Sequence, residues 1–286
     1  MSANRTRSSR SSAASTRSFS STSKPQTVAD PELGVTAVHQ VYARQRPGYT
    51  GRLTVPVLWD RKTEQIVSNE SADIIRMFNS AFDHLGATPG DYYPEPLREE
   101  IDAVNERVYH TVNNGVYKSG FATTQEAYEE AVYPLFETLD WLEERLAASR
   151  WLVGGTLTEA DIRLFTTLVR FDPVYHGHFK CNRQKLTEMP VLWAYARDLF
   201  QTPGFGDTVD FDHIKRHYYE VHRDINPTGI VPLDTFELDE ILDPRHGMAG
   251  GRRIDLDQQP APAYDFIDVE SYAKQQFFFL GNRSRS

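Results

Sequence analysis

A short apolar segment interrupted by a proline constrains the fold more than any other feature of this chain. Residues 54–60 read Thr-Val-Pro-Val-Leu-Trp-Asp, and a polar turn at 61–64 separates them from a second apolar run at 65–67. Proline has no amide hydrogen to donate to a sheet, so Pro56 belongs at an edge or at a strand start, with a cis bond as one option. The pattern predicts a β-hairpin whose first strand is a buried run over 53–59.

A helix is predicted directly after this hairpin. Ser68 or Asn69 can cap its first turn, and apolar residues recur at helical spacing over 74–78. Glu70 and Ser71 then stand at the N-terminus of the helix. Free backbone amides and the helix dipole favour an anion at that position. The arrangement is therefore suited to holding a small anionic peptide.

The rest of the chain, from about residue 96 to about 220, has the pattern of amphipathic helices. A capping box is predicted at Thr158, with the carboxylate of Asp161 accepting the Thr158 amide. Two further helices are expected over 191–200 and 211–222. The apolar positions of the first two long helices are Ile101, Val104, Val108 and Val112, followed by Ala127, Ala131, Leu135, Leu139, Leu142 and Leu146.

Charge and composition exclude several classes of protein. The 286 residues are 40% apolar and carry a net charge of -9, and residues 1–28 contain five basic residues and no acid. The remainder is therefore strongly acidic, which disfavours nucleic-acid binding. No apolar run approaches the roughly 18 residues that a membrane span needs. The single cysteine fits a reducing, cytoplasmic location, while the Ser/Arg-rich start is either a disordered tail, a wrongly chosen start or a transit peptide.

Seven motifs occur in order along the chain: Thr54-Val-Pro-Val-Leu-Trp-Asp60, Asn69-Glu-Ser-Ala-Asp-Ile-Ile-Arg-Met-Phe78, Asn113-Asn-Gly-Val-Tyr-Lys118, Leu157-Thr-Glu-Ala-Asp-Ile-Arg-Leu-Phe165, Arg170-Phe-Asp-Pro-Val-Tyr175, His178-Phe-Lys-Cys181 and Ile225-Asn-Pro-Thr-Gly229. Together they resemble the glutathionyl-hydroquinone reductases, which are the xi-class glutathione transferases. The resemblance implies an α/β plus all-α fold. A partial thioredoxin-like domain is expected over 31–90 and an all-helical glutathione transferase C-terminal domain over 91–232. Residues 1–30 are expected to be disordered, and residues 233–286 to be an extended or disordered tail.

The resemblance also implies a site for glutathione or a related γ-glutamyl thiol. Val55, the residue before the proline, would present its backbone N–H and C=O to the cysteinyl unit. Glu70 would bind the ammonium group of the γ-glutamyl end, and Ser71 with the helix N-terminus would bind its carboxylate. Arg52 and Leu53 would lie beside this site. The alternative is an ordinary edge-strand proline followed by an ordinary helix cap.

Three tyrosines are implied in the chemistry by the same resemblance. Tyr117 would be the proton donor and acceptor at the substrate, while the hydroxyls of Tyr175 and Tyr218 would lower the pKa of a thiolate. In the resembling enzymes a cysteine thiolate attacks the sulfur of a glutathionyl-hydroquinone, and a second glutathione then releases the enzyme. The substrate would be a quinol or an aromatic thioether, and the expected assembly is a homodimer. Taken singly, each tyrosine is better explained as an amphipathic residue at the edge of a hydrophobic core.

The nucleophile is the feature that this sequence does not show. The family carries it in a Cys-Pro-Trp-Ala motif upstream of the position of Val55, and the printed sequence contains no such motif. Cys181 is expected to be an inert buried residue instead. Whether the chain is an enzyme therefore stays open. The hypotheses are a reductase-like transferase without its cysteine step, a noncatalytic ligand-binding or dimerisation scaffold, and a frameshift or wrong start in the record.

Histidine spacing offers only weak signals for a metal site. His213 and His217 stand four residues apart and can share a helix face, but no nearby residue completes a ligand set. His176 and His178 are expected in a loop with no clear partner. No metal is therefore expected.

Overall fold

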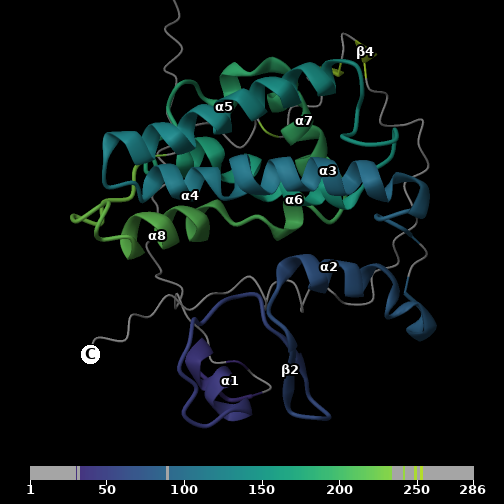
Figure 1. Ribbon diagram of the computed structural model, residues 1–286, viewed down its shortest axis with the longest axis vertical. Coiled ribbons are helices and arrows are strands. Elements are labelled where there is room, and N and C mark those ends of the chain that lie inside the picture. The colour runs from purple at the N-terminus through teal and green to yellow at the C-terminus, as the bar shows by residue number, and fades with distance from the viewer. Residues whose placement is uncertain are drawn as a thin grey trace, which may run out of the picture.

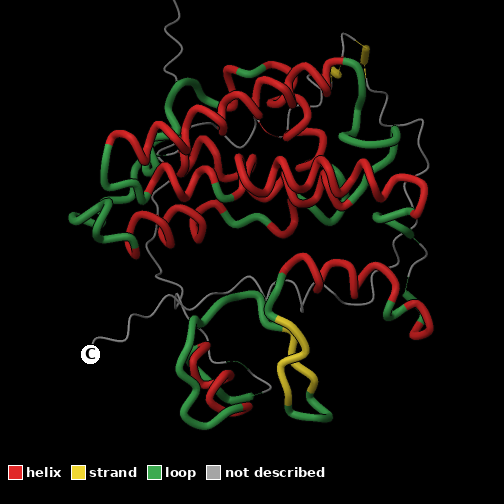
Figure 2. The backbone as a smooth tube through the Cα atoms, in the orientation of Figure 1, coloured by secondary structure: helices red, strands yellow, loops and turns green. Residues whose placement is uncertain are grey.

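Helices make up most of the regular structure, and one short hairpin stands apart from them (Figure 2). The computed structural model describes residue 30, residues 33–87 and 90–233, and residues 241, 248, 249, 252 and 253. The segments predicted at 1–30 and 233–286 lie almost wholly outside the described residues. Within the described part, no helix has the length and apolar character needed to cross a bilayer.

The small N-terminal unit consists of α1 (Val38–Gln45), the strands β1 (Leu58–Asp60) and β2 (Gln65–Ser68), and α2 (Ser71–Ser80). The two strands pair antiparallel, as predicted, and the Val55-Pro56 bond is cis. The prediction of a buried strand over 53–59 was wrong, because the strand spans only 58–60 and Leu53 and Val55 are 44% and 42% exposed. Residues 53–57 have no strand beside them in the described part of the chain, so no ladder forms there.

The start of α2 also differs from the prediction. Its N-cap is Glu70 rather than Ser68 or Asn69. The hydroxyl of Ser68 accepts the Glu70 amide at 3.1 Å, and the side-chain amide of Asn69 donates to Oγ1 of Thr54 at 2.6 Å. These two side chains are therefore occupied in holding the approach to the helix. Of its predicted apolar face, Ile74 is buried, but Phe78 is 51% exposed.

The helical unit confirms the predicted series of amphipathic helices. In Figure 1, α3 and α4 run end to end below α5, and α8 lies beneath α4. Among the packed pairs are α4 with α5, α5 with α7 and α3 with α6. The long helices are α3 (Arg98–Val108), α4 (Gly115–Gly120), α5 (Gln125–Ala147), α6 (Glu159–Arg170), α7 (Pro190–Gln201) and α8 (Phe211–Val221). The shorter elements are η1 (Asp83–Leu85), η2 (Glu95–Leu97), η3 (Tyr109–Asn113), η4 (Phe171–Tyr175), η5 (Leu186–Glu188), η6 (Gly206–Thr208), β3 (Met248–Ala249) and β4 (Arg252–Arg253).

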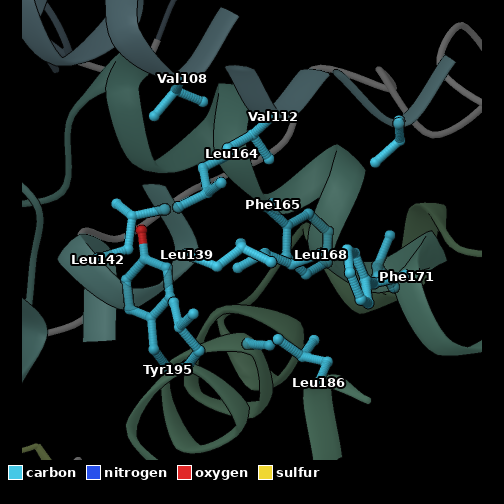
Figure 3. Close-up of a cluster of buried hydrophobic side chains, with 14 of the residues drawn as sticks. Val108, Val112, Leu139, Leu142, Leu164, Phe165, Leu168, Phe171, Leu186 and Tyr195 are labelled. Carbon is cyan, nitrogen blue, oxygen red and sulfur yellow. The ribbon is translucent and has the colours of Figure 1, made fainter. Parts of the chain in front are cut away.

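The hydrophobic core lies between these helices, as Figure 3 shows. The predicted apolar positions of α3 and most of those of α5 are buried there, and Leu135, Leu139 and Leu142 have no exposed surface. Leu164 and Leu168 of α6 belong to the same cluster, and Figure 3 shows them near Leu139 and Leu142. Each fully buried leucine contributes about 2 kcal/mol through removal of apolar surface from water. The core of the helical unit therefore provides the rigid frame on which the site residues stand.

The capping carboxylate predicted at the start of α6 is present, and it accepts more hydrogen bonds than the sequence indicates. Oδ2 of Asp161 accepts the amide and the hydroxyl of Thr158 at 2.8 and 3.0 Å. Its Oδ1 accepts the Leu152 amide at 2.9 Å and the Tyr195 hydroxyl at 2.7 Å. Asp161 has no exposed surface. One carboxylate thus joins α6, α7 and the loop that precedes α6.

An ion pair between the partly exposed Arg76 and the buried Glu159 connects the small unit to the helical unit. The guanidinium of Arg76, on α2, donates to both carboxylate oxygens of Glu159 at 3.2 and 2.9 Å. It also donates to Asp102 at 2.6 Å and lies 4.0 Å from the ring centre of Tyr93. The Glu159 side chain is only 4% exposed, and Asn105 donates to it at 2.8 Å. Arg76 therefore connects α2 to α3 and α6, in addition to the hydrogen bonds of Asn79 with Asp91 and Tyr92.

Candidate functional site

The three tyrosines singled out in the sequence meet at one point of the structure. Tyr117 comes from α4, Tyr175 from η4 and Tyr218 from α8, and α4 and α8 lie beside each other in Figure 1. The hydroxyl of Tyr218 is hydrogen-bonded to that of Tyr117 and lies 3.0 Å from that of Tyr175. Tyr117 is 39% exposed, whereas Tyr175 and Tyr218 are buried. The result is a chain of hydroxyls leading from the surface inward.

Two π-helical segments position the ends of this chain. The segment η3 precedes α4, and η4 contains Tyr175 as its last residue. The side-chain amide of Asn113, at the end of η3, donates to the hydroxyl of Thr167 on α6 at 2.6 Å. A π-helical turn changes the direction of the side chains that follow it, and such turns are frequent at functional sites. The motif at 113–118 therefore anchors the helix start that carries Tyr117.

The buried tyrosines of the chain are neutral. Burial raises the pKa of Tyr175 well above its usual value, and the neighbouring phenols of Tyr218 and Tyr117 act in the same direction. Burial likewise raises the pKa of Tyr218 above the ordinary tyrosine range. A neutral phenol can donate one hydrogen bond and accept another. The line of three hydroxyls can therefore pass a hydrogen bond, or a proton, from Tyr175 through Tyr218 to Tyr117.

Phe179 lies at the centre of the aromatic cluster. Its ring is stacked on that of Tyr175 at 5.5 Å and lies 5.3 Å from the ring of Tyr117 and 5.7 Å from that of Tyr218. Phe179 has no exposed surface. Gly120 of α4 leaves the room for it, because a Cβ atom added at Gly120 would lie 2.2 Å from Cγ of Phe179. The ring arrangement thus depends on a glycine on one side and a phenylalanine on the other.

Gly120→Ala is expected to lower the free energy of unfolding by about 2 kcal/mol, because overpacking displaces the Phe179 ring. Urea denaturation followed by circular dichroism measures this. Gly115→Ala in the same helix is the matched control, since its added Cβ would meet Leu135 at an ordinary 3.6 Å. The control is expected to be neutral or slightly stabilising, because alanine favours helix more than glycine does. Equal losses in both variants would contradict the packing argument.

The histidines beside this cluster were only partly anticipated. The prediction that His178 has no clear partner was wrong, because its Nε2 lies 3.3 Å from Nδ1 of His222. His222 follows Tyr218 by four residues and is the C-cap residue directly after α8. His213 and His217 are the pair expected to share a helix face. Nδ1 of His213 lies 3.7 Å from Oδ2 of Asp210. Within the described residues, no group of three or more His, Cys, Asp or Glu side chains could hold a metal ion.

Stability is expected to fall in mild acid because of these histidines. Burial, together with His222 and Lys180, lowers the pKa of His178 to about 4, below the unfolded value of about 6.5. Between these two pH values the unfolded chain binds more protons than the folded chain. The free energy of unfolding therefore falls as the pH drops from about 6.5 towards 4, and the contribution is fully present above 6.5. Denaturation at a series of pH values measures it, and His178→Gln should flatten the profile.

The residues predicted to bind a γ-glutamyl thiol form a second, exposed group. Arg52, Leu53, Val55, Glu70 and Ser71 are all exposed. The hydrogen bond from the side-chain amide of Asn69 to the hydroxyl of Thr54 brings the segment at 52–55 and the start of α2 together. The Tyr42 hydroxyl on α1 donates to the Thr54 carbonyl at 2.9 Å. In the described structure no hydrogen bond engages the backbone of Val55 or the carboxylate of Glu70, so both are available to a ligand.

The tyrosine chain and the exposed group around Val55 are separate in the structure. Among the described residues, no hydrogen bond joins the tyrosine chain to the exposed group around Val55. A cavity of about 260 Å³ lies between α2 and α6, and none of the predicted site residues lines it. Its lining includes Ile75, Phe78, Asn79, Tyr92, Glu159 and Ile162.

The cysteine has the properties predicted for an inert residue. Cys181 has no exposed surface, and burial raises the pKa of its thiol to about 12. A thiol in this state is neither accessible nor ionised at neutral pH. Cys181 is therefore not the nucleophile of the site.

Comparisons with known proteins agree with this architecture. The model of the glutathione S-transferase C-terminal domain family matches residues 125–198. Over 206 residues the chain is 58% identical to the glutathionyl-hydroquinone reductase PcpF of Sphingobium chlorophenolicum, covering 72% of this chain and 66% of the relative. The chain is 56% identical over 210 residues to the glutathionyl-hydroquinone reductase YqjG of Escherichia coli, covering 73% of this chain and 63% of that protein. It thus spans slightly less than two thirds of the length of these two relatives.

Solved structures extend the comparison to the fold. The glutathione-bound structure of YqjG superimposes with a TM-score of 0.75 and 53% identity, covering 79% of this chain and 73% of that one. The xi glutathione S-transferase of Phanerochaete chrysosporium superimposes with a TM-score of 0.71 and 54% identity, covering 75% of this chain and 69% of that one. The fold is a partial thioredoxin-like unit followed by a helical glutathione transferase domain. The chain therefore belongs to the xi-class glutathione transferases, the family of the glutathionyl-hydroquinone reductases.

Proposed function

We propose that this chain binds glutathione, or a related γ-glutamyl thiol, and holds glutathionyl-hydroquinones at its tyrosine chain for reduction by a thiolate that Cys181 does not supply. The observation that carries the proposal is the line of three hydroxyls that ends at the half-exposed Tyr117. Its support comes from the identity to PcpF, a glutathionyl-hydroquinone reductase, and from the glutathione-bound structure of YqjG. The substrate class is a small quinol or aromatic thioether.

The proposed chemistry is a reductive cleavage of the thioether of the substrate, in which the attacking thiol is oxidised to a disulfide and the ring carbon is reduced. A thiolate attacks that sulfur, the bond from sulfur to the ring carbon breaks, and the ring carbon gains a proton supplied by Tyr117. The products are the free quinol and a disulfide between the attacking thiol and glutathione. If the attacker is a protein cysteine, a second glutathione thiolate then attacks the glutathionyl sulfur of the mixed disulfide, which frees the cysteine thiolate and forms glutathione disulfide. Tyr218 and Tyr175 stabilise negative charge along this path by donating hydrogen bonds.

Glutathione would be held by the exposed group around Val55. The free backbone N–H and C=O of Val55 match the two hydrogen-bonding groups of the cysteinyl unit. Glu70 can bind the ammonium of the γ-glutamyl end, and the Ser71 hydroxyl with the first amides of α2 can bind its carboxylate. The exposure of all three is consistent with a ligand site that is open in this structure.

Calorimetric titration with glutathione tests the binding half of the proposal. We expect binding at millimolar concentrations or below, and no binding of the dipeptide cysteinylglycine, which lacks the γ-glutamyl end. Glu70→Gln and Ser71→Ala are each expected to weaken binding roughly tenfold, because a charge-assisted hydrogen bond is lost. Glu64→Gln is the matched control, since Glu64 lies in the hairpin turn and pairs with Arg44. Absence of glutathione binding would favour a noncatalytic scaffold of the same fold.

The reductase half is tested separately by quinol release from a glutathionyl-hydroquinone in the presence of glutathione. For a polypeptide of the printed sequence, we expect binding without the cysteine-dependent step, because its one cysteine is buried and protonated. Cys181→Ala should leave the result unchanged. Turnover comparable to that of PcpF would show that another group supplies the thiolate. A homodimer stays a prediction, which light scattering coupled to gel filtration can check.

A further inference from the structure

A histidine pair joins the same two segments as the tyrosine chain does. His178 lies three residues after Tyr175, and His222 lies four residues after Tyr218. Nε2 of His178 is 3.3 Å from Nδ1 of His222, and the two tyrosine hydroxyls are 3.0 Å apart. The His178 amide donates to the Val174 carbonyl, and the His222 amide donates to that of Tyr218. The end of η4 and the end of α8 are therefore connected at two points, about one helical turn apart.

The rings of the pair also restrict Tyr218 directly. The His222 ring stands perpendicular to that of Tyr218, with centres 5.3 Å apart, and is stacked on Phe179 at 5.8 Å. The His178 ring lies 4.6 Å from that of Tyr219, and His178 is only 5% exposed. In a close-packed interior, a ring cannot turn unless its neighbours move. The Tyr218 ring therefore has little freedom while His222 is held by His178.

We propose that His178 and His222 are positioning residues for Tyr218, and that their hydrogen bond keeps its hydroxyl between those of Tyr117 and Tyr175. The histidine pair would thus support the tyrosine site, and any effect of the pair on catalysis rests on the proposed function. The arrangement itself does not need substrate, because it can be observed in the tyrosine and histidine signals of the protein alone. Neither histidine touches the reacting atoms in this scheme.

The bond requires at least one uncharged imidazole. In a neutral pair one ring nitrogen donates and the other accepts, whereas two imidazolium rings have only donors and repel each other. Burial lowers the pKa of His178 to about 4 and lowers that of His222 as well, so the neutral pair prevails at neutral pH. The titratable and charged groups that face the pair or its neighbours are Lys180, His217, Arg170, Asp224, Tyr218 and Tyr219.

Two matched replacements at each histidine test the proposal. His222→Asn keeps a hydrogen-bonding atom near the position of Nδ1, and His178→Gln keeps one near that of Nε2. His222→Leu and His178→Leu retain similar bulk without the bond. The readout is the ¹³Cζ resonance of Tyr218, assigned with Tyr218→Phe and followed with pH. His110→Leu is the control, because His110 is 54% exposed and its side-chain contacts in the described structure are with Glu106 and the ring of Tyr109, neither of which belongs to the tyrosine chain.

In the wild type, we expect Tyr218 to remain protonated well above pH 10. In the two leucine variants its titration should move down by about one pH unit, because the hydroxyl chain opens to water. The Asn and Gln variants should remain close to the wild type. The double leucine variant should shift no further than either single one, because the two side chains act as one unit. A folded leucine variant with an unchanged Tyr218 titration would overturn the proposal.

The wild-type protein provides a test that does not depend on the variants folding. As the pH falls towards 4, within the range where the circular dichroism is unchanged, the Tyr218 resonance should shift in parallel with the imidazole signal of His178. An independent response of the two signals would overturn the proposal. Neither measurement uses glutathione or a quinol. Failure of the proposed function would leave both results intact, and failure here would leave glutathione binding intact.

Discussion

Replacement of Asp161 by alanine is expected to lower the free energy of unfolding by about 4 kcal/mol, which is the largest effect that we predict for a single substitution in this chain. Four donors lose their acceptor, including the backbone amides of Leu152 and Thr158 and the hydroxyl of Tyr195. All of them are buried, so water does not replace the lost partner without opening the core. Urea denaturation followed by circular dichroism measures the loss.

Asp210→Ala is the matched control for this prediction. Asp210 also stands at a helix start and accepts the amide of His213 at 3.0 Å, but its side chain is 59% exposed. Its removal is expected to cost about 1 kcal/mol, the usual value for a lost helix cap. Asp161→Asn keeps one carbonyl oxygen and should fall between the two. Equal losses for Asp161→Ala and Asp210→Ala would show that burial of the network adds nothing.

Replacement of Arg76 by methionine is expected to lower the free energy of unfolding by about 3 kcal/mol, the second largest effect. The buried carboxylate of Glu159 would lose its bidentate partner and keep only the Asn105 amide at 2.8 Å and Arg163 at 3.7 Å, and removing the main partner of a buried charge is strongly destabilising. The loss should be centred on α2, because this side chain connects the small unit to the helices. Denaturation measures the total, and faster hydrogen exchange of the α2 amides locates it.

A comparison with exposed ion pairs makes this prediction specific. Arg44 and Glu64 form a pair of 3.0 Å whose side chains are 41% and 63% exposed, and Arg44→Met is expected to cost less than about 1 kcal/mol. The double variant Arg76→Met with Glu159→Met should recover much of the stability, since it removes both charges together. A small loss for Arg76→Met, with α2 exchange unchanged, would mean that other contacts position the small unit.

The helical unit is the part that local sequence patterns predict well. Spacing of three and four residues identified the buried faces of α3 and α5, because a helix that packs on a core must carry its apolar side chains on one side. The carboxylate of Asp161 was also predicted at its correct position. Its bonds to Leu152 and Tyr195 were not, because these partners are 9 and 34 residues away.

The hairpin shows where local patterns mislead. The apolar residues over 53–59 favour a buried strand, yet a strand forms only where another strand lies alongside to exchange hydrogen bonds. Likewise, Ser68 and Asn69 are good helix caps in isolation, but their side chains bind the Glu70 amide and Thr54 instead. Competition between local and more distant partners decided both outcomes.

The candidate site divides in the same way. The tyrosines were identified through motifs that resemble a known family, and the structure brings all three together. Phe179 lies in one of the seven motifs and Gly120 in none of them, and the packing of the Phe179 ring against Gly120 arises only when α4 and the segment after η4 meet. The partner of His178 was hidden for the same reason, because 44 residues separate the two histidines.

By itself, the sequence determined the order of the elements, the buried faces of the helices, the inert character of Cys181 and the family. The elements, their buried faces and the expectation for Cys181 follow from side-chain type and short-range periodicity, which any stretch of a few turns contains, whereas the family follows from the resemblance of seven ordered motifs. Only the tertiary structure decided how the hydroxyls of Tyr117, Tyr218 and Tyr175 connect, which imidazole holds Tyr218, and how Arg76 attaches α2. Each of these is a contact between segments distant along the chain, and its energy depends on burial that no local pattern specifies.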